Sequence, residues 1–244
     1  MNLARVLFVV SGVAEEVPPE GYQQLRGWLV HHHLLWDDEG VYLIDGGFLG
    51  GVTRVEEALN AVGRTWADVR AILLTNGRLG HTLNVSALRE KAGCQVFAPL
   101  SDRDHLFGEA RYGKLSRIAG LAEQIGRWAS SYEVPFVDHW FVPDEPLPFW
   151  GGLRVIALPG HTMGHCGFYS RDRRLLFSGD LFTNYWGLVK RPLPWFNANS
   201  RMIQRSIVRA LDLELEGVLP NHCRVGSPAS HLADLEGLGR RLQK

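Results

Sequence analysis

Side chains that can bind a metal ion stand at the ends of several apolar runs in this sequence. His161, Asp180 and His222 each follow a short apolar run and a turn residue, the pattern of a strand that delivers a ligand at its end. His81 closes a fourth such segment, residues 74–81, which reads LTNGRLGH. Imidazoles and a carboxylate together suit zinc, iron or manganese. With His81, Asp180 and His222 as ligands and His161 to complete four, a bound ion could activate water and polarise a carbonyl or phosphoryl oxygen.

Arg78 and Asn76 in the same segment argue against an ordinary metal site. A guanidinium directed into the site would repel a dication and could pair with Asp180 in its place. In the alternative arrangement, Arg78 turns to solvent. Asn76 could offer a weak carbonyl ligand or donate to a substrate, but a residue of this type more often caps a loop.

Composition sets the outer bounds of the class of protein. With 244 residues and 45% hydrophobic content, we expect one large α/β domain spanning residues 1–244. The 26 basic and 26 acidic residues balance, which argues against nucleic acid as a partner. A small-molecule substrate or ligand is expected instead. The 3 cysteines have no paired spacing, and no apolar stretch reaches membrane-spanning length. These features predict a soluble, cytoplasmic protein without a membrane partner.

Alternating strands and helices are expected along most of the chain, which indicates the α/β class. The predicted strands are residues 6–10, 28–36, 41–44, 71–74, 94–98, 153–158, 166–170, 175–178 and 217–219, and the predicted helices are residues 52–61, 83–92 and 200–211.

A mostly helical insertion is predicted at about residues 102–131, between two similar halves. Leu106, Ile118, Leu121, Ile125 and Trp128 recur at helical spacing, which predicts a packed pair of helices. A lid over a substrate and a purely structural extension are both open as its role.

The order of these segments resembles the metallo-β-lactamase superfamily, in its branch of glyoxalase II-like hydrolases. The resemblance is based on DGG at residues 45–47, PGHT at 159–162, SGD at 178–180 and the lone late His222, and it runs from about residue 28 to about residue 226. It implies an αββα four-layer sandwich, in which two mixed sheets pack face to face with helices outside.

The family motif THxHxDH is incomplete in this chain. Thr75 and His81 match it, whereas Asn76, Arg78 and Gly80 stand where the pattern has His, His and Asp. The resemblance implies that the first of two metals would keep only the histidine of PGHT, His161. The second would keep His81 and His222, with Asp180 as the bridging carboxylate. At most one divalent ion is therefore expected, with zinc first and iron or manganese as alternatives, and a site without metal is a further alternative.

Three further polar residues are candidates for supporting roles. The resemblance implies that Asp45 orients a ligand and that His165 lies beside the metal without binding it, with a proton shuttle or ligand role as the alternative. His31 belongs to a run of three histidines, residues 31–33, and could supply a replacement ligand if it is not a packing or surface residue.

Three functions from different classes follow from these residues. The first is a hydrolase of an ester, thioester or lactone, with one metal and with His81, Asp180 and His222 as catalytic residues. The second is a catalytically inactive relative that binds a small anion through Arg78, or binds a partner. The third is a mononuclear iron oxygenase that uses the same two histidines and carboxylate. The substrate and the oligomeric state do not follow from the sequence.

Overall fold

Two six-stranded β-sheets form the centre of the computed structural model, which describes residues 20–110, 116–185 and 187–243. The strand predicted at residues 6–10 lies outside these ranges. The first sheet has its strands in chain order, namely β1 (Gly21–Leu25), β2 (His32–Trp36), β3 (Val41–Ile44), β4 (Val69–Leu73), β5 (Gln95–Pro99) and β6 (His139–Phe141). Its first three strands pair antiparallel and the last four pair parallel.

Helical crossovers connect the parallel strands of this sheet, as parallel pairing requires. They are α1 (Gly51–Ala61) and η1 (Trp66–Asp68) before β4, then α2 (Leu79–Thr82) and α3 (Val85–Ala92) before β5, and η2 (Leu100–Asp102), α4 (Arg103–Phe107) and α5 (Arg117–Ala129) before β6.

The second sheet has the strand order β11-β10-β9-β8-β7, and β12 pairs with β10. Its strands are β7 (Pro146–Leu147), β8 (Leu153–Ala157), β9 (Cys166–Ser170), β10 (Leu175–Tyr185), β11 (Leu188–Lys190) and β12 (Gly217–Cys223). Only the β10–β12 pair is parallel among these strands, so this sheet is mixed as well. The helices η3 (Pro194–Phe196) and α6 (Ser200–Leu211) precede β12, and α7 (Pro228–Leu242) follows it.

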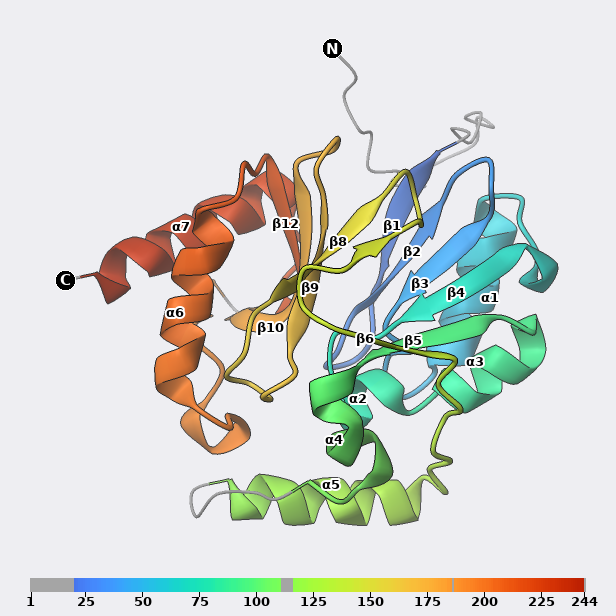
Figure 1. The fold of residues 1–244 in the computed structure, drawn as a ribbon, viewed down its shortest axis with the longest axis horizontal. Helices are drawn as coiled ribbons and strands as arrows, with labels where there is room; N and C mark the ends of the chain where they lie inside the picture. The colour runs from blue at the N-terminus through green and yellow to red at the C-terminus, as the bar shows by residue number, and fades with distance from the viewer. Residues whose placement is uncertain (1–19, 111–115, 186, 244) are drawn as a thin grey trace.

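Three apolar clusters hold four layers together. The central cluster lies between the sheets and joins side chains such as Leu73 of β4 and Phe177 of β10. A second cluster packs α1 and α3 on the first sheet, and a third packs α6 and α7 on the second. Figure 1 shows α1 and α3 on one flank of the sandwich and α6 and α7 on the other. The predicted αββα architecture is therefore confirmed.

Several predicted boundaries differ from the structure. β1 was not expected, and β2 begins at His32 because residues 28–31 leave the sheet, where the backbone amide of His31 donates to the carbonyl of Asn221. The helix expected at residues 83–92 is α3, which begins at Val85. A separate short helix, α2, precedes it, and between the two the Asn84 side chain donates to the carbonyls of residues 46–48. β10 continues to Tyr185, beyond the predicted end at residue 178. The prediction stopped there because polar residues interrupt the apolar pattern, although they do not end the strand.

The expected packing of helix α5 is wrong. Leu106 of α4 is fully buried, but Ile118, Leu121, Ile125 and Trp128 expose between 56% and 84% of their surface. Helical spacing shows that a helix has an apolar face, but it does not show which face the protein covers. In Figure 1, α5 lies beyond α2 and α4 at one end of the sandwich. Within the described ranges, no helix is both long and apolar enough to cross a membrane.

Candidate metal centre

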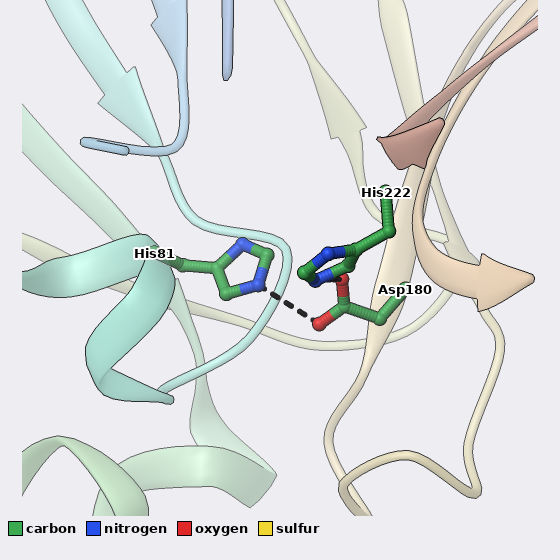
Figure 2. A group of neighbouring side chains, drawn as sticks. All are labelled: His81, Asp180 and His222. Carbon is green, nitrogen blue, oxygen red and sulfur yellow. Dashed lines mark ion pairs between the residues drawn. The ribbon is translucent and has the colours of Figure 1, made fainter. Parts of the chain in front are cut away.

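Two histidines and an aspartate from three separate elements converge at one end of the sheets. His81 comes from α2, Asp180 from β10 and His222 from β12, and Figure 2 shows the two imidazole rings directed at the carboxylate. His81 Nε2 lies 2.8 Å from Asp180 Oδ2, and His222 Nε2 lies 2.9 Å from Asp180 Oδ1. One ligand atom from each residue lies within 4.8 Å of the others. His81 and Asp180 are buried, whereas the His222 side chain is 23% exposed.

The position of Asp180 depends on an irregularity in β10. The register of its parallel pairing with β12 shifts on both sides of Gly179, which has a φ angle of 54°. Glycine adopts this left-handed conformation without a steric penalty. A Cβ atom there would lie 2.5 Å from His165 Nε2, so no larger residue fits. The bulge changes the direction of the strand, and it delivers Asp180 to the site.

Asp45 fixes the orientation of His81. Its Oδ2 atom lies 2.9 Å from His81 Nδ1, and the carboxylate also accepts hydrogen bonds from Thr75 and from the Asn221 side chain. Because Nδ1 of His81 donates to Asp45, Nε2 is the atom that faces Asp180. Burial lowers the pKa of His81, but the carboxylates of Asp180 and Asp45 more than offset this and raise it to about 10.

Asp180 is a buried carboxylate surrounded by imidazoles. Burial alone would raise its pKa, but His81, His222 and His161 overcome this effect and hold the pKa well below its usual range. The group therefore stays ionised across the physiological pH range, as a metal ligand must.

His161 and His165 have different places beside this group. His161 Nε2 lies 3.2 Å from Asp180 Oδ2, and burial holds the pKa of His161 well below its usual value. His161 nevertheless stands outside the compact set of three ligand residues. His165 donates from Nδ1 to the carbonyl of Leu158 and accepts the backbone amide of Asp180 at Nε2. Both ring nitrogens of His165 are therefore engaged, and the residue supports the backbone of Asp180.

Residues 75–81, the ligand loop, run from the end of β4 into α2. Asn76 accepts the backbone amide of Arg78 with its Oδ1 atom and donates from Nδ2 to Asp180 Oδ2 at 3.1 Å. It thus caps the loop as expected, and it also contacts the carboxylate at the position where the family pattern has a histidine.

Arg78 does not make the predicted pair with Asp180 among the contacts described. Its Nη2 atom donates to the carbonyl of Phe196 at 2.7 Å, and Nη1 lies 3.8 Å from Glu123 Oε2. The other expected arrangement, with Arg78 turned to solvent, is wrong because the residue is buried; the carbonyl of Phe196 and the carboxylate of Glu123 contact its guanidinium.

The histidine run supplies no member of the compact group. His31 Nε2 lies 2.9 Å from the carbonyl of Cys223, and His32 and His33 are fully buried in β2. Burial lowers the pKa of all three. These contacts indicate packing residues rather than a replacement ligand.

Three residues near the site were not singled out from the sequence. Tyr185 contacts His222 Nδ1 through its hydroxyl at 3.4 Å, and Asn221 donates to Asp45. Asp102 accepts from the backbone amides of Gly77 and Gly164 and from the hydroxyl of Thr162, so it joins the ligand loop to the loop that carries His161. Asn221 could have been found from the sequence, because it directly precedes His222. The roles of Tyr185 and Asp102 depend on contacts between distant parts of the chain.

The fold and the position of the His–Asp–His group define the class of αββα proteins with a polar site at the ends of their sheets. The metallo-β-lactamase superfamily model matches residues 26–216, and the chain belongs to this superfamily. Its members are metal-dependent, commonly through zinc.

Individual relatives are identical to this chain at about a quarter of the aligned positions. The hydroxyacylglutathione hydrolase GloC of Haemophilus influenzae is 26% identical over 171 residues, which are 68% of this chain and 70% of that protein. A metallo-β-lactamase family protein of Thermus thermophilus has a TM-score of 0.69 at 22% identity, covering 93% of this chain and 80% of the other. The protein TTHA1623, solved in a di-iron-bound form, has a TM-score of 0.63 at 26% identity, covering 85% and 95%.

Proposed function

We propose that this protein is a hydrolase of an ester, thioester or lactone that uses one divalent metal ion, held by His81, Asp180 and His222. The observation that carries the proposal is the convergence of three ligand atoms within 4.8 Å of one another. Two imidazoles and one carboxylate form a common ligand set of catalytic zinc sites. The ion would lower the pKa of a bound water molecule and polarise the scissile carbonyl.

The donor atoms have the orientation that a divalent ion requires, and a bound ion would displace the proton that Asp180 and Asp45 stabilise on His81. Asp180 is ionised, and the tie between His81 Nδ1 and Asp45 leaves Nε2 directed into the site. His222 reaches the same carboxylate from the neighbouring strand and keeps some exposure to solvent. Among the described residues, three form the compact set; the family pattern assigns His81 and His222 to its second metal position and Asp180 to the bridging carboxylate. We therefore assign one ion, with zinc first.

The neighbouring residues have separate proposed tasks. His165 holds the backbone of Asp180, and Asp45 holds the ring of His81. His161 was predicted as a fourth ligand, but it stands outside the compact set. We assign it to hydrogen bonding with a small-molecule substrate beside Asp180. The hydroxyacylglutathione hydrolase activity of the Haemophilus relative supports an acyl thioester as one substrate to test.

Metal reconstitution tests this function directly. Protein stripped with a chelator is loaded with zinc, manganese or iron, its metal content is measured, and hydrolysis of a phenyl ester, an S-acylglutathione and a γ-lactone is followed. We expect one equivalent of metal and hydrolysis of at least one substrate. His222→Ala should weaken zinc binding by about 100-fold and abolish hydrolysis. His139→Ala, which removes a more exposed histidine outside the site, should change neither. Failure to retain any of the three metals would overturn the proposal.

A mononuclear iron oxygenase is the second candidate, because two histidines and one carboxylate also form the usual ligand set of such enzymes. One structurally similar protein holds iron, although as a pair of ions. Oxygen consumption by the iron-loaded protein in the presence of a thiol or persulfide, without hydrolysis of the three test substrates, would favour this second function.

A further inference from the structure

Helix α5 reaches the ligand loop through the carboxylate of Glu123. Its Oε1 atom accepts the backbone amide of Leu79 at 3.0 Å and lies 3.1 Å from Nη2 of Arg127. Its Oε2 atom lies 3.8 Å from Nη1 of Arg78. The three charged side chains expose only about a tenth of their surface. One largely buried anion thus contacts both the backbone and a side chain of the loop.

Arg127 adds a second connection to the same loop. Its Nη2 atom donates to the carbonyl of Gly77 at 3.3 Å and to the carbonyl of His105, and Nη1 donates to the carbonyl of Leu106. The last two carbonyls belong to α4. Arg127 therefore links the ligand loop to α4, while Glu123 links it to α5.

Two glycines allow these elements to approach each other closely. A Cβ atom on Gly126 of α5 would lie 2.8 Å from Leu79 Cδ2. A Cβ atom on Gly77 of the ligand loop would lie 2.6 Å from Leu106 Cδ1 and 2.7 Å from the carbonyl oxygen of Asp102. The contact between the loop and the two helices is therefore fitted in shape as well as in charge.

We propose that Glu123 and Arg127 hold the ligand loop in position, a task that the first metal ion of the family pattern would perform through the two missing histidines. By fixing the loop, they position His81. The loop has Asn76 and Arg78 where the family pattern has two histidine ligands, so a metal cannot fix it through those side chains. The carboxylate of Glu123 instead fixes Leu79, two residues before His81, and partly balances the charge of Arg78. Glu123 and Arg127 are positioning residues, since their described contacts reach no member of the compact group.

The first test measures the loop in the absence of metal, so it does not depend on the proposed function. Amide hydrogen exchange is compared in the wild-type protein, Glu123→Ala, Glu123→Gln and Gln124→Ala, an exposed position on the same helix. Loss of a charged hydrogen-bond acceptor should speed exchange at Leu79 and His81 by about tenfold in Glu123→Ala, while Leu43 in β3 stays unchanged. Glu123→Gln keeps an acceptor and the shape of the side chain, so it should show a smaller change. Exchange as slow as in Gln124→Ala would overturn the proposal.

The second test measures the effect on His81 and rests on the proposed metal site. Zinc affinity is determined by calorimetry, and cobalt is used as a spectroscopic probe of the ligand geometry. Glu123→Ala should weaken zinc binding by about tenfold and alter the visible absorption of bound cobalt. Faster exchange with unchanged zinc affinity and an unchanged cobalt spectrum would overturn the positioning role. If the wild-type protein binds neither metal, the proposed function fails, and the exchange experiment alone decides whether Glu123 holds the loop.

Discussion

The two sides of the candidate site are held in different ways. On the strand side, Asp180 and His222 belong to β10 and β12, and backbone pairing between these strands fixes His222 and the residues that flank the bulge carrying Asp180. On the loop side, His81 is fixed by side chains from elsewhere, namely Asp45 at its ring and Glu123 near its backbone. Backbone pairing does not depend on side-chain identity, whereas a loop requires specific partners. This difference explains how substitutions can accumulate in the ligand loop while the ligand atoms still converge.

The two sides also differ in charge: the strand side carries an anion, and the loop side carries a cation. Asp180 of the strand side is surrounded by imidazoles, which hold its pKa low and keep it anionic. The loop side carries Arg78, whose guanidinium lies 3.8 Å from Glu123 and whose charge contributes to the low pKa of His161. A dication therefore meets a carboxylate on one side of the site and a cation paired with a carboxylate on the other.

The largest effect is expected from removing the carboxylate of the strand side. Asp180→Asn keeps the shape of the side chain but removes the negative charge, so zinc affinity should fall by about 100-fold or more. Calorimetric titration with zinc measures this change. Asp172→Asn, an exposed aspartate in the turn before β10, serves as the matched control and should bind as the wild type does. Zinc binding that survived in Asp180→Asn would place the metal elsewhere.

Restoring the family motif would make the loop side resemble a complete site. The triple variant Asn76→His, Arg78→His and Gly80→Asp should bind a second equivalent of metal. A Cβ atom at Gly80 would lie 3.2 Å from one methyl group of Val30, which a small shift can accommodate. Because Glu123 loses a cationic partner, the metal-free triple variant should lose about 2 kcal/mol in the free energy of unfolding.

Metal analysis and urea unfolding measure these two outcomes. If the triple variant still bound one equivalent of metal, residues other than these three would also prevent a second metal ion from binding.

Acid should destabilise the folded protein through protonation of the buried His32. The two sides of the site can therefore be compared only at a pH at which the protein stays folded. Burial lowers the pKa of His32 to about 3, against 6.5 for an ordinary histidine. The unfolded chain therefore binds this proton more readily. The stability is complete above about pH 6.5 and falls toward about pH 3, by up to about 1.4 kcal/mol per pH unit.

Urea unfolding at a series of pH values measures this slope. His32→Leu should make it shallower, because one of the buried histidines with a lowered pKa is gone. Identical slopes in the wild type and in His32→Leu would show that His32 is not responsible for the acid sensitivity.

The smallest effect is expected from the exposed face of α5. Ile118→Ser and Trp128→Ser alter side chains that expose 80% and 84% of their surface, so each should change the free energy of unfolding by no more than about 0.5 kcal/mol. Zinc affinity should not change, in contrast to Glu123→Ala on the inner face of the same helix. A large loss of stability would mean that the apolar face is covered in solution.

The sequence predicted the fold and the strand side better than the loop side. Asp180 and His222 follow apolar runs that are strands, and a strand fixes the direction of its last side chains. The order of the motifs was sufficient for the αββα architecture. For Arg78, pairing with Asp180 and exposure to solvent both stayed open, because attraction between opposite charges was the only information available. Its partner Glu123 lies on a helix whose apolar spacing suggested burial of the opposite face. Contacts of this kind depend on how distant elements dock, which spacing along the chain does not contain.

Asp102 gives the site a cooperative character. Its buried carboxylate accepts hydrogen bonds from Gly77 in the ligand loop and from Thr162 and Gly164 in the loop that carries His161. Neither loop can separate from this carboxylate without leaving a buried charge partly unsatisfied. The two loops are therefore expected to open as one unit, with a single opening free energy that governs both.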